Sequence, residues 1–386
     1  MSPSATKKRV EYIDLLRGWA VIVMIQTHVF NATLGPEVTT GALYQAVKFI
    51  DGLVAPSFLF ASGLAYAVTT RRKVNEYLAF GRPLFRQFAR LLFILAVGYV
   101  LHLPKFNYDQ LVHDAGPEAW QIFFQVDVLH CIAASLLFLQ VLLLILHSER
   151  RLYGALTAVA VGVVFATPVM WGVDFRHLVP MPVAAYLNGH HPSLFPLFPW
   201  SAFLFAGAIA GYWYVEGRQK QQEGAELKMM NAAALGGLGL IVLSFILEPL
   251  ASTVYPVYDY WLFSPSFVLL RLGIVLILCY AMFRYEKLRG VSPGSPVTLI
   301  GRESLIVYAT HLMLIYGKFG SRTFQEVVGN SFGYPEAIVA TLIVLVAMYL
   351  LALAWSRMKQ GPPRLKLAAE LGTLAAFLGV FFFWPA

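Results

Sequence analysis

The sequence has little charge and little cysteine. Charged residues make up 13% of its 386 residues, whereas soluble domains carry about 25%, so a soluble globular protein is not expected. The two cysteines, Cys131 and Cys279, lie in apolar segments without a CxxC spacing, which argues against a disulfide framework and a thiolate metal site. No HExxH or similar ligand pattern occurs in the sequence, so we expect no bound metal.

Basic residues outnumber acidic ones, but they form no basic domain. The formal net charge is +8, and the lysines and arginines are spread over short segments between apolar runs. We therefore expect a lipid bilayer as the partner of this chain, and no nucleic acid. A cleavable signal peptide is not expected, because Lys7, Lys8 and Arg9 lead directly into an apolar run longer than a signal sequence needs.

Apolar runs of roughly 20 residues are long enough to cross a bilayer as helices. They predict an all-α polytopic integral membrane protein with about eleven transmembrane helices, in a single domain over residues 1–386. The third run is the shortest, and its helix can begin earlier, within the basic segment GRPLFRQFARLLFILAV. The spans lie near 13–34, 43–69, 91–103, 127–147, 154–173, 196–215, 230–248, 264–283, 297–317, 335–355 and 367–385.

Loop charges predict the orientation of these spans. If the N-terminus is cytoplasmic, most of the 29 basic residues lie in segments on the cytoplasmic side, and the alternate loops all follow this pattern. Such an asymmetry is what the positive-inside rule describes. We therefore expect a multi-pass protein of the cell inner membrane, with a cytoplasmic N-terminus and a C-terminus on the opposite side.

The first predicted span contains ionisable residues that are costly in lipid. Within IDLLRGWAVIVMIQTHVF, the side chains of Asp14, Arg17 and His28 lie on one stripe of a helix, since Arg17 and His28 are about three turns apart. Such side chains must face protein or a water-filled cavity. The stripe therefore predicts a polar path along the protein-facing side of this helix.

Depth, counted along the predicted helices, places the polar residues in two layers. In the ninth span, Ser304, Tyr308 and His311 share one helix face. The outer layer, in the half of the membrane away from the cytoplasm, contains His28, Asp51, Asp127, His130, Arg271 and His311. The inner layer contains Asp14, Arg17, Arg302 and Glu303, beside Arg86 and Arg90.

These residues also have purely structural interpretations. Asp14 and Arg17 can form an ion pair at a helix end, and the side chains of Arg302 and Glu303 can extend to the cytoplasmic interface. A single histidine inside the membrane can be a packing residue with satisfied hydrogen bonds. The remaining histidines are interpreted as solvated residues: His102, His113, His147, His177, His190 and His191.

The outer layer contains the groups that a general base needs. An imidazole oriented by a carboxylate accepts a proton near neutral pH, and either His28 with Asp51 or His130 with Asp127 can supply this pair. Arginines at the cytoplasmic side suit a phosphorylated donor. This layout indicates acyl transfer across the membrane. The alternative is a transporter, in which histidines and aspartates carry protons and Arg271 binds an anion.

Several segments resemble a known family. They are RVEYIDLLRGWAVIVMIQTH, GLVAPSFLFASGLAYA, FQVDVLHCI, FPLFPWSAFLFAGAIAG and LIGRESLIVYATHLMLIYG. Their order is similar to that in the bacterial branch of the heparan-α-glucosaminide N-acetyltransferase catalytic-domain family. The resemblance implies a multi-span enzyme of the transmembrane acyltransferase superfamily, whose lysosomal member moves acetyl from cytosolic acetyl-CoA to a terminal glucosamine.

One position departs from this family. The catalytic histidine proposed for the animal enzyme lies in the loop after the first span, whereas the loop NATLGPEVTTGALYQ of this sequence contains no histidine. His28 lies about three turns earlier and is a local candidate for the same role. Heparan sulfate is not an expected bacterial substrate, so an envelope glycan is the more sensible acceptor class by analogy.

We therefore expect a membrane acyltransferase that moves an acyl group, acetyl by resemblance, from cytosolic acyl-CoA to a small-molecule or glycan acceptor, at a sugar amine or hydroxyl. A transporter or exporter of a small anionic or glycan-like solute is the alternative, and a non-catalytic membrane scaffold is a third. A homodimer is a candidate assembly. The candidate catalytic residues are His28, Asp51, His311, Asp127 and His130. The candidate residues for binding acetyl-CoA are Asp14, Arg17, Arg86, Arg90 and Arg302, and those for binding the acceptor are Arg271, Ser304 and Tyr308.

Overall fold

The part of the chain that the computed structural model describes is mostly helical. That part comprises residues 10–105, 107–191, 193–219, 224–292, 294–317 and 323–362, with isolated positions at 372, 375, 379, 381 and 382. It contains no β-strand, and its only isolated bridge pairs Leu34 with Phe332. The predicted all-α fold class is confirmed.

The chain forms two compact units. Unit 1 comprises Met1–Ala61 and Val275–Ser356, and unit 2 comprises Ser62–Ile274 and Arg357–Ala386. Helices α3 (Val54–Thr70), α13 (Pro265–Arg289) and α17 (Tyr334–Gln360) contribute residues to both units. A single domain over residues 1–386 stays a prediction.

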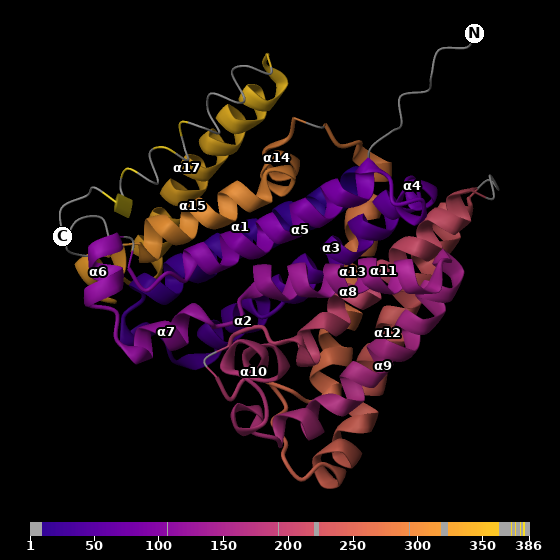
Figure 1. The fold of residues 1–386 in the computed structure, drawn as a ribbon, viewed down its shortest axis with the longest axis horizontal. Coiled ribbons are helices and arrows are strands. Elements are labelled where there is room, and N and C mark those ends of the chain that lie inside the picture. Colours follow the sequence, from indigo (N-terminus) through magenta and orange to yellow (C-terminus); the bar gives the residue numbers. More distant parts are fainter. Residues whose placement is uncertain are drawn as a thin grey trace. The chain divides into compact units, whose positions relative to one another are not determined.

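Unit 1 contains most of α17 and parts of α3 and α13 (Figure 1). Its other elements are α1 (Glu11–Thr33), the short 3₁₀ helix η1 (Pro36–Val38), α2 (Gly41–Asp51), α14 (Pro296–Arg302), α15 (Ser304–Tyr316) and α16 (Phe324–Val328).

Unit 2 contains the middle of the chain. Its elements are α4 (Val74–Leu78), α5 (Arg82–Leu101), α6 (Tyr108–His113), α7 (Pro117–Phe123), α8 (Val128–Leu146), α9 (Glu149–Trp171), η2 (Phe175–His177), α10 (Met181–Leu187), α11 (Leu197–Gln219) and α12 (Ala225–Val254).

The first ten predicted spans all coincide with helices, and two of these spans are interrupted. The span predicted at 43–69 divides into α2 and α3, and the span predicted at 297–317 divides into α14 and α15 at Glu303. The third helix begins at Arg82, within the basic segment, earlier than position 91. The span predicted at 367–385 lies outside the continuously described residues, as do Lys7, Lys8 and Arg9.

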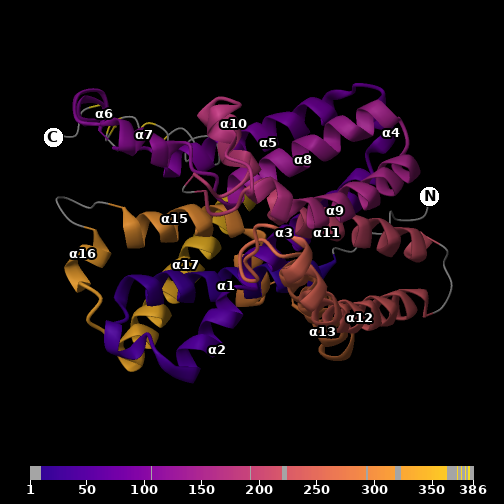
Figure 2. The ribbon, with the colours of Figure 1, turned by 90° about the horizontal axis from the view of Figure 1, so that it is seen from below.

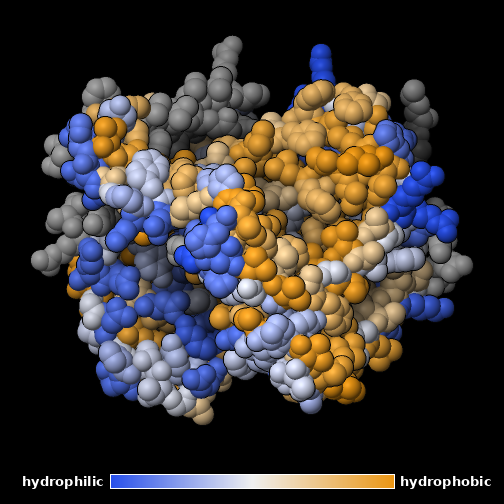
Figure 3. Space-filling view, turned by 60° about the horizontal axis from the view of Figure 1, so that its bottom comes forward, coloured by the Kyte–Doolittle hydropathy of each residue, from blue (hydrophilic) through white to orange (hydrophobic). Residues whose placement is uncertain are grey.

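Eight of the described helical segments are long and apolar enough to cross a membrane. Two of them, α12 and α17, turn most of their apolar side chains outward, including Leu235, Phe245, Leu342 and Val346. Wide hydrophobic areas are visible on the molecular face in Figure 3. Large apolar surfaces of this kind are stable only against lipid or another protein, which agrees with a multi-pass membrane protein.

Two glycines set the packing of α1 in unit 1. A Cβ atom at Gly18 would lie 2.0 Å from the backbone oxygen of Val297, and one at Gly301 would lie 2.1 Å from the backbone oxygen of Asp14. Helices α1 and α14 therefore touch backbone to backbone, as small residues allow in membranes. Helix α15 continues along α1 toward its C-terminal end (Figure 1).

Unit 2 packs α5 against α8, and α9 against α11 (Figure 2). At one end of this unit, the Arg71 guanidinium donates to the Glu149 carboxylate at 2.7 Å, to the Glu216 carboxylate at 3.3 Å and to Gln219 Oε1 at 2.6 Å. These hydrogen bonds connect the segment after α3 to α9 and α11. Arg71 therefore has a structural role in addition to its place among the basic loop residues.

Candidate functional site

Two histidines of unit 1 meet near the C-terminal end of α1. The rings of His28, on α1, and His311, on α15, have centroids 5.3 Å apart. The Tyr316 hydroxyl lies 3.3 Å from His28 Nδ1, and its ring stands edge-on to the His28 ring at 5.6 Å. The depth count placed His28 and His311 in one layer, and the structure brings their side chains together.

The hydrogen bonding of His311 leaves one ring nitrogen suited to accept a proton. Its Nδ1 lies 2.9 Å from the backbone oxygen of Val307. Because a carbonyl only accepts, Nδ1 must carry the hydrogen in the neutral ring, and Nε2 must carry the lone pair. His311 is fully buried, and Nε2 has no hydrogen-bond partner among the described residues. A buried imidazole with a fixed tautomer and an available lone pair has the properties of a general base.

Asp51 is buried at the end of α2, which packs against α1 in unit 1. Its carboxylate lies 3.7 Å from Lys48 Nζ, and Thr27 and Gln26 of α1 are close to it. Lys48 also donates to Asn31 Oδ1 at 2.5 Å. The structure thus places Asp51 beside the turn of α1 that contains His28. An orienting role of Asp51 toward His28 stays a prediction.

Asp127 and His130 of unit 2 form a helix cap. Asp127 is the N-cap of α8, and its carboxylate accepts from the backbone N–H groups of Val128 and His130. The backbone N–H of Asp127 in turn donates to His130 Nδ1 at 3.2 Å. This reciprocal pattern is a capping box, which satisfies the unpaired N–H groups at a helix start. Both residues thereby have a structural role.

The cap also fixes the tautomer of His130. Since Nδ1 accepts a hydrogen bond, the hydrogen of the neutral ring is on Nε2. The ring is fully buried against Tyr99, at 4.3 Å between centroids, and a Cβ atom at Gly98 would lie 2.8 Å from it. His130 therefore presents a donor where His311 presents a lone pair, so the geometry favours His311 over His130 as a base.

The predicted inner residues of unit 1 lie around the start of α1 and the junction of α14 with α15. Asp14 and Glu303 are buried, and Arg17 and Arg302 are half-buried. Arg302 is in the last turn of α14, where a positive charge is favourable to the helix dipole. Nearby, Glu286 of α13 accepts from the backbone N–H of Tyr12 at 2.7 Å and so caps the start of α1.

The other candidates have different surroundings. Arg86 and Arg90 are exposed on α5 in unit 2. Arg271 is buried in unit 2, with its guanidinium carbon 4.8 Å from the centre of the Phe267 ring and 6.0 Å from that of Trp261. In unit 1, Ser304 opens α15 and is half-buried, while the Tyr308 ring is buried 5.7 Å from the His311 ring.

The residues of the predicted outer layer belong to two different units. His28, Asp51 and His311 belong to unit 1, whereas Asp127, His130 and Arg271 belong to unit 2. The inner residues are divided in the same way: Asp14, Arg17, Arg302 and Glu303 belong to unit 1, and Arg86 and Arg90 belong to unit 2.

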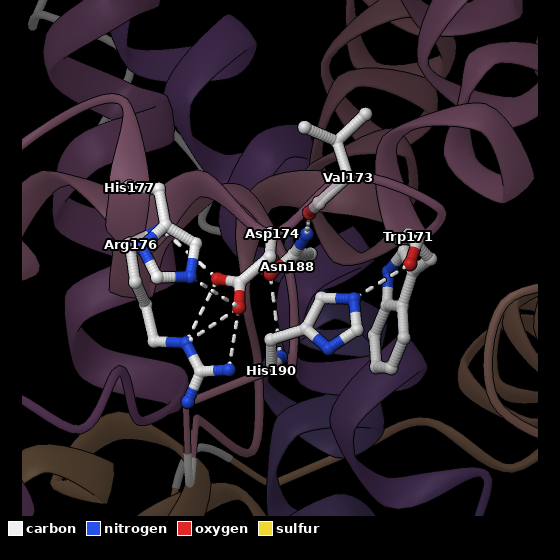
Figure 4. Close-up of polar contacts among 7 residues, drawn as sticks. All are labelled: Trp171, Val173, Asp174, Arg176, His177, Asn188 and His190. Carbon is white, nitrogen blue, oxygen red and sulfur yellow. Dashed lines mark hydrogen bonds and ion pairs between the residues drawn. The ribbon is translucent and has the colours of Figure 1, made fainter.

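A loop of unit 2 between α9 and α11 has an ordered polar network (Figure 4). Arg176 contacts the Asp174 carboxylate with Nε at 2.8 Å and with Nη2 at 2.5 Å. The guanidinium holds the pKa of Asp174 well below its usual range. Asn188 donates to the backbone oxygens of Met170 and Val173, at 2.8 and 2.7 Å. The network fixes the path of this loop.

His191 differs from the prediction that it is solvated. It follows the exposed His190 directly, but only 7% of its surface is exposed. The sequence pair HH does not distinguish the two residues, because the fold of the loop decides which ring is turned inward. Burial lowers the pKa of His191.

We expect His191 to make stability depend on pH. A free histidine has a pKa near 6.5, and the folded protein favours the neutral ring. The contribution of His191 is therefore fully present above about pH 6.5 and is lost as the pH falls from there toward its lowered folded pKa. Thermal unfolding in detergent, measured at about pH 7.5 and about pH 5, should show a weaker pH dependence for His191→Asn than for the parent.

The matched control for this prediction is His113→Asn. The His113 side chain is 70% exposed, so its variant should keep the pH dependence of the parent. Equal pH dependence in the parent and in His191→Asn would assign the effect to another group.

Tyr316 is the residue at this site that the sequence interpretation missed. It lies five positions after His311, inside the segment LIGRESLIVYATHLMLIYG quoted for the family resemblance. The signal that could have found it is a tyrosine on the helix of His311, toward the C-terminal end of that helix. Its contact with His28 joins residues 288 positions apart, and such a contact is not readable from one sequence.

Comparisons with known proteins agree with this description. The sequence model of the family described as heparan-alpha-glucosaminide N-acetyltransferase, catalytic, matches residues 9–247. A comparison with curated proteins gave no match. The matched region includes α1, α2 and α8, and it ends before α13, so His311 and Tyr316 lie outside it. The chain is a multi-pass membrane acetyltransferase, helical and without strands in its described part, and belongs to the heparan-alpha-glucosaminide N-acetyltransferase catalytic-domain family.

Proposed function

We propose that the protein transfers an acetyl group from cytosolic acetyl-CoA to the amine or hydroxyl group of a sugar on the opposite side of the cell inner membrane. The observation that carries this proposal is the pair His28 and His311, which lies at one end of α1 in a chain of the acetyltransferase family. The family match favours an enzyme over a transporter.

The proposed reaction uses a base near the C-terminal end of α1. His28 or His311 takes the proton from the attacking amine or hydroxyl. The Asp51 carboxylate contributes a negative charge to the electrostatic potential at these two histidines. The acetyl carbon bonds to the acceptor while its bond to sulfur breaks, and the thiolate recovers the proton from the imidazolium. Asp127 and His130 are further candidates from the sequence, although their capping geometry makes them weaker ones. Arg271, Ser304 and Tyr308 are proposed to contact the acceptor.

The donor is proposed to enter from the start of α1. Arg17 lies eleven residues before His28 on one unbroken helix, a separation of about 16 Å at helical rise. An extended pantetheine arm has a comparable length, so phosphates held near Arg17 and Arg302 would leave the thioester within reach of His28. Asp14 lies on the same stripe of α1, at the donor end.

Binding of acetyl-CoA to the purified protein tests the proposal most simply. Calorimetry should show saturable binding of acetyl-CoA, and radiolabelled acetyl should pass to glucosamine used as a probe acceptor. A folded protein that binds no acetyl-CoA but transports a small anionic or glycan-like solute would support the transporter alternative instead.

Arg86 and Arg90 provide a prediction about donor binding. They are four residues apart on α5 and are exposed, so their guanidinium groups are available to phosphate. Loss of one charge-assisted contact costs about 1.5–3 kcal/mol. The double variant Arg86→Ala with Arg90→Ala should therefore weaken acetyl-CoA binding by about ten-fold or more, as measured by calorimetry.

Arg150→Ala with Arg151→Ala is the control for this experiment, because these residues are also basic and lie at the start of another helix, α9. The control should bind acetyl-CoA like the parent. If the α5 variant also binds like the parent, Arg86 and Arg90 act only on membrane orientation.

A further inference from the structure

The Tyr316 hydroxyl contacts two atoms of one residue. It lies 3.3 Å from His28 Nδ1 and also 3.3 Å from the backbone oxygen of His28, to which it donates. A hydroxyl has one hydrogen, and the backbone oxygen can only accept. With the hydroxyl hydrogen directed at the backbone oxygen, the Nδ1 contact is a hydrogen bond when Nδ1 carries a hydrogen and donates it to the Tyr316 oxygen.

This arrangement favours the Nδ1–H tautomer of His28. With the hydrogen on Nδ1, the lone pair of the neutral ring is on Nε2. His311 reaches the same tautomer through the backbone oxygen of Val307. The two neighbouring rings therefore both present Nε2 lone pairs, although they use different partners to do so.

We propose that Tyr316 is a positioning residue for acetyl transfer. This inference rests on the proposed function: Tyr316 holds His28 as the Nδ1–H tautomer, so that Nε2 can take the proton from the acceptor. An N–H bond forms at Nε2 while the O–H or N–H bond of the acceptor breaks, and the departing CoA thiolate later recovers this proton. Serine hydrolases use a carboxylate to orient a histidine in the same way.

A tyrosine suits this task inside a membrane protein. A carboxylate beside His28 would place a further negative charge within a membrane-spanning segment, which is costly. The neutral hydroxyl fixes the ring orientation without that cost. When Nε2 gains a proton, the Nδ1–H bond to the Tyr316 oxygen becomes charge-assisted and stronger.

The direct test uses Tyr316→Phe in the full-length protein, purified in detergent. Phenylalanine keeps the edge-on ring and removes only the hydroxyl. We expect kcat for acetyl transfer to glucosamine to fall about ten- to a hundred-fold, while KM for acetyl-CoA changes by less than about two-fold. In a His28→Ala background, the same substitution should cause no further loss, because Tyr316 acts through His28.

Tyr334→Phe is the matched control. The Tyr334 hydroxyl also donates to a backbone oxygen of unit 1, that of Val38 at 3.2 Å, but within the described residues it makes no contact with an imidazole. This variant should keep the parent kcat. A parent-like kcat in Tyr316→Phe as well, or an additive loss in the His28→Ala background, would overturn the proposal.

A spectroscopic measurement separates this inference from the proposed function. Nitrogen-15 NMR of protein with labelled histidine reports which ring nitrogen carries hydrogen, and His28→Asn identifies the His28 signals. We expect protonated Nδ1 and unprotonated Nε2 in the parent, and a mixture of tautomers in Tyr316→Phe. An Nε2–H ring in the parent would overturn the proposal. If the parent transfers no acetyl, the proposed function fails, and the tautomer measurement still decides what Tyr316 does to His28.

Discussion

Replacing His311 by alanine should lower the rate of acetyl transfer by roughly 10²–10⁴-fold, the usual effect of removing a general base. The expectation follows from the buried ring and from the Nε2 lone pair that the Val307 hydrogen bond creates. This prediction takes His311 as the base. His28→Ala is the companion experiment, because it tests the rival assignment on which the proposal for Tyr316 rests, and the two rings are neighbours. Acetyl-CoA binding should remain close to that of the parent in both variants, since the donor is proposed to bind at the other end of α1.

Two further variants make this experiment decisive. His311→Asn keeps a polar side chain of similar volume, so a loss of activity in both substitutions is not due to a cavity alone. His113→Ala removes an exposed histidine of unit 2 and should leave transfer unchanged. If His28→Ala and His311→Ala both transfer acetyl at the parent rate, these histidines are structural and the proposed mechanism is wrong.

Gly301→Val should strongly destabilise unit 1. Even the Cβ atom alone would lie 2.1 Å from the backbone oxygen of Asp14, closer than any van der Waals contact permits. Backbone cannot move aside as a flexible side chain can, so the cost should reach about 3 kcal/mol or more, at the upper end of overpacking effects. Fluorescence-detected size-exclusion chromatography in detergent should show little monodisperse protein, and the remainder should unfold at a lower temperature.

Gly236→Ala is the control for this second prediction. It replaces a glycine inside α12 where an added Cβ atom meets no atom within 4 Å. That variant should be neutral or more stable by about 0.5–1 kcal/mol, because alanine favours the helix. A Gly301→Val protein with parent-like yield and unfolding temperature would show that α1 and α14 do not touch as described.

The helices were predictable because the membrane imposes a simple rule on the sequence. An apolar run of about 20 residues must be helical to satisfy its backbone in lipid, and the first ten predicted spans coincide with helices. The breaks at Gly52 and Glu303 were not predictable, because hydropathy remains high across a short interruption. Helix α12 is also longer than the apolar run at 230–248 that predicted it, because helices continue into the membrane interface.

The candidate site was predictable in depth but not in detail. Counting residues along straight helices placed His28 and His311 at one level, and their rings are neighbours. The depth of a residue along its helix does not say which other helices are its neighbours. The same count therefore also included Asp127 and His130, which belong to the other unit and cap a helix there. Hydrogen-bond partners such as Tyr316, and the ring tautomers that they fix, depend on the three-dimensional packing.

Transfer across a sealed membrane tests the central claim most directly. The purified protein is reconstituted into vesicles that enclose glucosamine, and radiolabelled acetyl-CoA, which does not cross the bilayer, is added outside. We predict that labelled N-acetylglucosamine accumulates inside the vesicles, and that its amount falls by roughly 10²–10⁴-fold when the vesicles contain the double variant His28→Ala with His311→Ala. Labelled product that forms only when both reagents are on the same side, or forms equally with the double variant, would contradict acetyl transfer across the membrane by His28 and His311.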